Sequence, residues 1–230
     1  MRTIGLLGGM SWESTAEYYR IINQRTAETL GGLHSAKLVL YRVDFEEIAA
    51  CQKQGDWTKT GDILADAAKH VVGAGADVVL IGTNTMHIVA DAVTAAINVP
   101  LLHIVDAVAQ RIVDFGMSRV GLLGTTFTME KDFYRDRLRT AGGIDAILPD
   151  KQDRDAVNRI IFEELCCGRI LEESRRYVIG LLDQLATQGA EGVVLACTEL
   201  PMLVQQSDTP VKVFDTTSIH AEAAVDYALQ

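Results

Sequence analysis

The residue with the clearest capacity for catalysis is Cys197. It follows an apolar, strand-like run and precedes Thr198 and Glu199. A thiol at the start of a helix has a lowered pKa, so this position predicts a reactive thiolate. Pro201 follows at a point where the first turn of a helix tolerates proline. The alternative is a buried, inert cysteine. The other three cysteines fit that alternative better: Cys51, Cys166 and Cys167.

Two further loops, residues 8–15 and 83–87, carry hydroxyl, amide and backbone N–H groups after predicted strands. Ligands of parallel sheets collect beyond the carboxyl ends of the strands, where helix N-termini stabilise anions. We therefore expect a carboxylate ligand at these loops. The spacing of Gly5, Gly8 and Gly9 matches neither G-x-G-x-x-G nor a phosphate-binding loop with its lysine, which argues against a nucleotide.

The composition narrows the classes of protein. The 230-residue chain has 21 Lys and Arg against 31 Asp and Glu, a net charge of −10, and 48% apolar residues. This balance suits a packed globular protein and repels nucleic-acid phosphates and anionic lipids. No apolar run reaches the roughly 18 residues of a membrane span, and the N-terminus lacks a secretory signal pattern. Without a C-x-x-C motif or ligand spacing among the histidines, we expect no disulfide framework, no metal, and a cytoplasmic location.

Short β-branched runs alternate with segments of helical period, which predicts an α/β fold with parallel sheets flanked by helices. The eight expected strands are residues 3–7, 37–43, 77–82, 101–105, 119–123, 144–148, 192–196 and 211–214. Helices are expected over 59–72, 156–168 and 171–188, the last ending before Gly189.

The two halves of the chain resemble each other. The segment 4–8 matches 120–124, and 75–83 matches 189–197, at nearly the same offset. Collinear matches of this kind indicate a duplicated α/β unit, although such strings also occur at ordinary strand–helix junctions. We expect one lobe from residues 1–106 plus a C-terminal helix over 216–230, and a second from 107–215. Two such lobes are expected to face each other across a cleft that holds the active site.

The duplication aligns Thr83 with Cys197. Two groups on opposite faces of one carbon could invert a stereocentre, because one removes a proton while the other returns one. Here the motifs become recognisable: Gly8-Gly9-Met10 with Ser14-Thr15, Asn84-Thr85 with His87, residues 121–125, and Cys197-Thr198-Glu199. They span nearly the whole chain. The sequence resembles the aspartate/glutamate racemases that work without pyridoxal phosphate, and most of all their bacterial L-aspartate/glutamate-specific branch.

The resemblance implies two pseudo-symmetric α/β domains, no cofactor, a homodimer and acidic amino acids as substrates. It makes Cys197 a catalytic acid/base that removes the α-proton of L-aspartate or L-glutamate. It assigns substrate-binding roles to Asn84, Thr85 and Thr198, and further lining roles to Met10, Gln52, Thr125 and Glu199. This chain departs from two-cysteine members at Thr83, whose hydroxyl can donate or relay a proton but is a poor base. We therefore expect directional chemistry, with D-substrates used slowly.

Alternatives remain open. A single-cysteine isomerase or decarboxylase of a dicarboxylate would use the same cleft, as would a broader-specificity racemase or a non-catalytic amino-acid-binding protein. Arg42 and Lys53 could hold the distal carboxylate but fit solvated surface charges better. His87 could face the ligand or serve as a structural, hydrogen-bonded histidine. Asp106 and Asp215 are expected to cap helices.

Overall fold

The computed structural model describes residues 1–230, which divide into two compact units, Met1–Ile104 with Thr217–Gln230, and Val105–Thr216. The eight strands predicted from the sequence all form, in two four-stranded parallel sheets. The α/β fold class is thereby confirmed. No helix combines the length and the hydropathy that crossing a bilayer requires.

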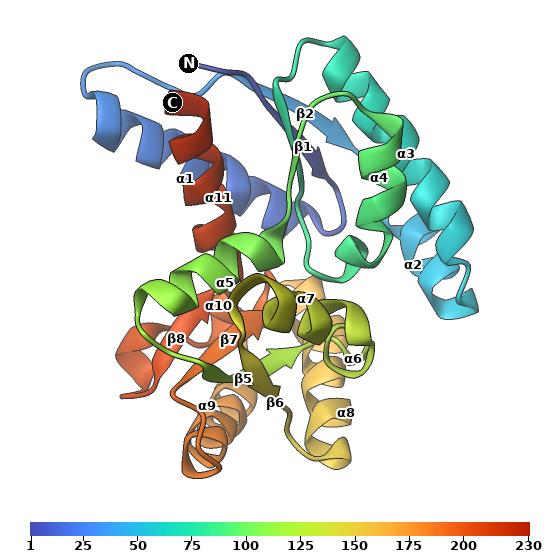
Figure 1. Cartoon of the computed structure of the whole chain (residues 1–230). Helices are drawn as coiled ribbons and strands as arrows, with labels where there is room; N and C mark the ends of the chain where they lie inside the picture. Colours follow the sequence, from blue (N-terminus) through green and yellow to red (C-terminus); the bar gives the residue numbers. More distant parts are fainter. The chain divides into compact units, whose positions relative to one another are not determined.

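The first unit contains a sheet of order β2-β1-β3-β4. Its elements are β1 (Ile4–Gly8), α1 (Trp12–Leu30), β2 (Leu38–Arg42), α2 (Phe45–Gln54), α3 (Trp57–Gly73), β3 (Val78–Ile81), the 3-10 helix η1 (Thr85–Val89), α4 (Ala90–Ala96), β4 (Leu101–Leu102) and α11 (Thr216–Leu229). Every residue of β1 and β3 is buried, as expected for central strands that helices cover on both faces. Figure 1 shows α1 crossing α11 on one side of this sheet and α3 beside α4 on the other.

The second unit contains a sheet of order β6-β5-β7-β8. Its elements are α5 (Ile104–Asp114), β5 (Arg119–Gly124), α6 (Thr126–Glu130), α7 (Asp132–Gly142), β6 (Asp145–Ile147), α8 (Lys151–Arg159), the π-helix η2 (Ile160–Glu164), the 3-10 helix η3 (Leu165–Cys167), α9 (Glu172–Thr187), β7 (Gly192–Ala196), α10 (Leu200–Leu203), the 3-10 helix η4 (Gln206–Asp208) and β8 (Lys212–Asp215). The apolar cluster on one face joins α8, η2, η3 and α9 to β5 and β7.

The two sheets have the same strand order, which is what a duplicated unit predicts. The register supports the alignment of Thr83 with Cys197: Leu7 pairs with Ile81, and Leu123 pairs with Leu195. Thr83 and Cys197 each stand two residues beyond the paired residue in β3 or β7. The halves of the chain therefore place these two side chains at equivalent points of their own sheets.

Three expectations about local structure need correction. β4 covers only Leu101–Leu102, because α5 already begins at Ile104. The stretch 156–168 is not one α-helix but changes from α8 to a π-helix and then a 3-10 turn. Asp106 lies inside the first turn of α5 and forms a two-pronged ion pair with Arg137 of α7, at 2.6 and 2.7 Å, so it joins two helices.

Candidate functional site

Cys197 lies directly beyond the buried strand β7 and is itself only 6% exposed. Its thiol donates a hydrogen bond to Oε2 of Glu199 at 3.0 Å, and the Thr198 hydroxyl donates to the same oxygen at 2.8 Å. Glu199 is 3% exposed. A buried thiol and a buried carboxylate thus share one short loop, and the hydroxyl of Thr198 fixes the carboxylate between them.

The expected lowering of the thiol pKa is wrong for this structure. Burial raises the pKa of Cys197 well above its ordinary value, and the negative charge of Glu199 raises the pKa further. The helix expected to stabilise a thiolate is only the single turn α10, which begins three residues after Cys197. Its dipole is therefore small, and burial decides the direction of the shift. The resting side chain is a neutral thiol beside a carboxylate.

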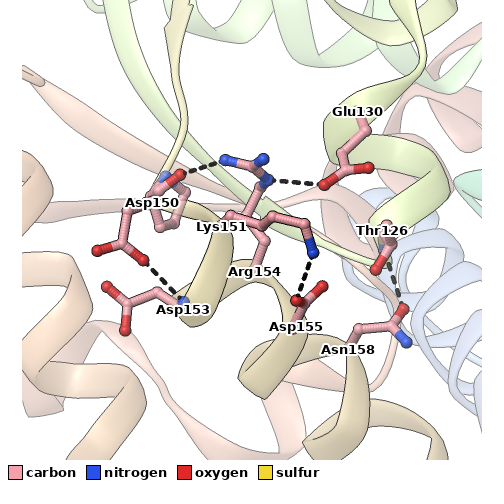
Figure 2. Close-up of polar contacts among 9 residues, drawn as sticks. Thr126, Glu130, Asp150, Lys151, Asp153, Arg154, Asp155 and Asn158 are labelled. Carbon is pink, nitrogen blue, oxygen red and sulfur yellow. Dashed lines mark hydrogen bonds and ion pairs between the residues drawn. The ribbon is translucent and has the colours of Figure 1, made fainter.

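Thr125 follows β5 as Cys197 follows β7, and Gly124 pairs with Ala196 in the register of these neighbouring strands. Thr125 caps α6, because its Oγ1 accepts the backbone N–H of Thr128 at 3.3 Å. Figure 2 shows how the next residue is held: Oδ1 of Asn158 in α8 accepts the backbone N–H of Thr126 at 2.9 Å. Thr125 and Cys197 therefore emerge side by side from one sheet.

The Thr83 loop follows β3 in the first unit. Thr83 is half-buried, while Asn84 and Thr85 are buried at the start of η1. The first turn of α1 contacts it, since the Ser14 hydroxyl donates to the carbonyl of Gly82 at 3.1 Å. His87 proves to be hydrogen-bonded to the backbone: its Nδ1 lies 2.8 Å from the carbonyl oxygen of Thr83. The structural reading of this histidine is thereby supported.

Two of the expected lining residues lie in the apolar layer that contains α2 and η1. Met10, at the end of the first loop, is 5% exposed within that cluster. Gln52 of α2 is 7% exposed, and its Nε2 lies 2.9 Å from Sδ of Met86. A buried amide against a thioether sulfur is weakly satisfied, which leaves Gln52 with hydrogen-bonding capacity for another group.

The remaining candidates divide by exposure. Cys51 is buried as expected, but Cys167 is exposed and Cys166 only partly buried, which corrects the expectation of inert core positions for this pair. Arg42 and Lys53 are exposed. The buried polar side chains include no Lys or Arg. No group of three His, Cys, Asp or Glu side chains has the arrangement of a metal site.

Sequence reasoning missed two supporting residues. Ser14 and Asn158 anchor the loops that carry Thr83 and Thr125. Ser14 stood within a quoted motif, but its partner, the carbonyl of Gly82, lies 68 positions away. Asn158 has no sequence signal, because a polar residue inside a predicted helix resembles a solvated one. A groove of about 1070 Å³ between α8 and α9 contains none of the candidate residues in its lining.

Comparison with known proteins finds similarity over nearly the whole chain. The family model described as Asp/Glu/Hydantoin racemase matches residues 7–224. A structure titled a putative Asp/Glu racemase from Yersinia pestis is 54% identical, with a TM-score of 0.93 over 100% of both chains. A structure of an aspartate racemase homologue from Pyrococcus horikoshii OT3 is 36% identical, with a TM-score of 0.88 over 100% of both chains. The broad specificity amino-acid racemase RacX of Bacillus subtilis is 22% identical over 96% of both chains. The chain belongs to the Asp/Glu/hydantoin racemase family and is an isomerase of the amino-acid racemase type.

Proposed function

We propose that the protein converts L-aspartate and L-glutamate to their D-forms without a cofactor. Cys197 removes the α-proton from the L-substrate, and the Thr83 side of the site returns a proton to the opposite face of the same carbon. The observation that carries the proposal is the pair formed by the Cys197 thiol and Glu199, buried together and 3.0 Å apart. A buried thiol hydrogen-bonded to a carboxylate has a proton acceptor within reach, which an inert core cysteine lacks.

Although its charge raises the thiol pKa, Glu199 also supplies a proton acceptor in contact with the thiol. A neutral thiol cannot remove an α-proton, so its own proton must first pass to the Glu199 carboxylate. The thiolate then takes the α-proton, and the bonding electrons remain on the α-carbon as a carbanion. The Thr83 hydroxyl, directly or through water, gives the carbanion a proton and regains one from solvent, while Glu199 releases the proton it holds. One proton leaves the substrate and one enters, so the reaction is a net isomerisation.

Substrate contacts are assigned to the polar groups around the two loops. Asn84, Thr85 and Thr198 are proposed to hold the α-carboxylate and the amino group. Lining roles are proposed for three further buried residues: Met10, Gln52 and Thr125. For Glu199 we propose the role of proton acceptor instead of the expected lining role, because its Oε2 accepts hydrogen bonds from the Cys197 thiol and the Thr198 hydroxyl.

The first experiment follows the α-proton of L-aspartate in D₂O by NMR and the product by chiral chromatography. The wild-type protein should incorporate deuterium at the α-carbon and produce D-aspartate. Cys197→Ser should lose both activities by a factor of at least about 10³, since a serine hydroxyl does not replace the thiolate. The matched control is Cys167→Ser, an exposed thiol, which should keep wild-type rates. Full exchange by Cys197→Ser contradicts the proposed role.

A broader-specificity racemase is the second candidate. It is favoured by the absence of Lys and Arg from the buried polar side chains, because a dedicated site for the distal carboxylate usually contains a cation. The similarity to a broad specificity racemase points the same way. A panel of both enantiomers of acidic, amide and apolar amino acids separates the two. Turnover of maleate or release of CO₂ from a dicarboxylate would instead indicate the single-cysteine isomerase or decarboxylase.

A further inference from the structure

His87 joins Thr83 to the segment that follows β4. Its Nδ1 lies 2.8 Å from the carbonyl oxygen of Thr83, and the backbone N–H of Ile104 donates to its Nε2 at 3.2 Å. A backbone N–H can only donate and a carbonyl can only accept, so Nδ1 carries the proton and Nε2 does not. The ring is 3% exposed. His87 is therefore a neutral imidazole of one defined tautomer, with a backbone partner for each nitrogen.

The surroundings of His87 restrict its ring. The ring of His103 packs edge-on with its centroid 4.4 Å away, and that of His220 lies 5.8 Å away. His220 is itself anchored, by the Tyr18 hydroxyl at 2.8 Å and the carbonyl of Leu102 at 2.9 Å. Rotation of the His87 ring would leave buried backbone groups unsatisfied, at a cost of about 1–3 kcal/mol for each group.

Both backbone polar groups of Thr83 are thereby held. Its N–H donates to the carbonyl of Ile81 at 2.8 Å, and its carbonyl accepts from His87. With the peptide units on either side fixed, the direction of the Cα–Cβ bond is fixed as well. The hydroxyl can then change position only by rotation about that bond, among the few staggered rotamers that threonine adopts.

We propose that His87 is a positioning residue that aims the Thr83 hydroxyl at the α-carbon, and this proposal rests on the proposed racemase function. His87 acts through the Thr83 backbone and does not touch the substrate. It should therefore matter for return of the proton on the Thr83 side and not for removal of the proton by Cys197. An ordinary stabilising residue would lower both half-reactions together.

The decisive experiment measures the two half-reactions separately in His87→Phe, which keeps a flat ring and removes both polar contacts. With L-aspartate in D₂O, α-deuterium exchange into the recovered L-enantiomer should stay within about twofold of wild type, while formation of D-aspartate falls by about tenfold to a hundredfold. KM should change little, because the substrate contacts remain. Equal losses of exchange and inversion overturn the proposal.

Two variants test the assigned contact. His87→Asn keeps a side-chain N–H able to donate to the Thr83 carbonyl, so it should recover part of the inversion rate that His87→Leu loses. His87→Phe should cost little additional inversion activity when Thr83 is already alanine, because His87 acts through that residue. Additive losses in the double variant, or no recovery with asparagine, contradict the proposal.

The matched control is His70→Phe. His70 makes the same type of bond, from Nδ1 to the carbonyl of Asp66 at 2.8 Å, but it is exposed on the outer face of α3. It should leave both half-reactions unchanged. Should His87→Phe fail to fold by circular dichroism, His87→Gln, which retains a donor and an acceptor, should show the same split at smaller size. A wild-type protein that neither exchanges nor inverts overturns the racemase proposal itself, and is thus distinguished from failure of the His87 assignment alone.

Discussion

At the scale of the residue, the protonation state of the buried Cys197 thiol depends on its neighbour Glu199. Burial and the charge of Glu199 both raise the thiol pKa, so the resting side chain of Cys197 is protonated. Glu199, the proposed acceptor, lies 3.0 Å from the thiol, and the Thr198 hydroxyl donates to the same carboxylate oxygen. A protonated thiol is less readily oxidised than a thiolate, and in the proposed mechanism one proton transfer to Glu199 generates the base.

Replacement of Glu199 by glutamine should shift the thiol titration and the activity in different ways. Removing the negative charge should lower the pKa of Cys197, yet leave it above the ordinary value, because burial is the larger cause. The near-ultraviolet thiolate absorbance, taken as the difference from Cys197→Ser, measures this pKa. The rate of α-proton exchange should nevertheless fall by about 10²-fold, because the proton acceptor is lost. An increased rate in Glu199→Gln would assign the carboxylate an inhibitory role instead.

At the scale of the element, α11 completes the first unit although it is the last helix in the sequence. Ala221, Ala224 and Val225 are buried in one cluster with α1, β1 and β3. His220 ties the helix to the sheet through its bond to the Leu102 carbonyl at 2.9 Å. Burial lowers the pKa of His220 from 6.5 to about 4. The stability of this helix attachment therefore depends on pH.

The lowered pKa of His220 determines how stability changes with pH. The unfolded chain protonates His220 below about pH 6.5, while the folded chain resists protonation until about pH 4, so the free energy of unfolding decreases as the pH falls between these values. The loss amounts to about 3 kcal/mol by the lower limit. His220→Gln, which keeps a donor and an acceptor, should remove this component in urea denaturation at neutral and acidic pH. The exposed His34, changed to Gln, is the control, and an unchanged pH profile in His220→Gln refutes the assignment.

At the scale of the whole molecule, two units with the same strand order carry different residues at equivalent positions. Thr83 and Cys197 each follow a fully buried central strand, β3 or β7. Because the equivalent positions carry a threonine in one unit and a cysteine in the other, we expect a reaction with a preferred direction. A cysteine can take a proton as the thiolate and give one as the thiol, whereas a threonine hydroxyl can donate or relay a proton but rarely removes one from carbon.

Thr83→Cys should restore chemical symmetry between the units. We expect the ratio of kcat/KM for D-aspartate to that for L-aspartate to rise by about tenfold or more, since a second thiolate can remove the α-proton from the D-enantiomer. Chiral chromatography with each enantiomer as the starting substrate measures the ratio. Thr83→Ser, which keeps a hydroxyl, is the matched control and should not raise it. An unchanged ratio in Thr83→Cys argues against the asymmetric mechanism.

Much of the fold could be predicted because its signals are local. Apolar β-branched runs form strands, Gly189 ends α9, and repeated strings such as residues 4–8 and 120–124 mark the duplication. The loops after β1, β3 and β7 could be singled out as candidate ligand-binding loops from their residue types alone. These features depend on neighbours close in the sequence, which the chain displays directly.

Tertiary structure decided the features that depend on burial and on partners distant in the sequence. The sequence placed Cys197 at a helix start and predicted a lowered pKa, but only the folded chain shows that the helix is one turn and the thiol is buried, which reverses the shift. The hydrogen bonds that fix the His87 ring likewise include the backbone N–H of Ile104, 17 residues from His87. Asn158 accepts a hydrogen bond from Thr126, 32 residues away. Desolvation and long-range hydrogen bonds arise from packing in three dimensions, so residue types and spacing alone could not reveal them.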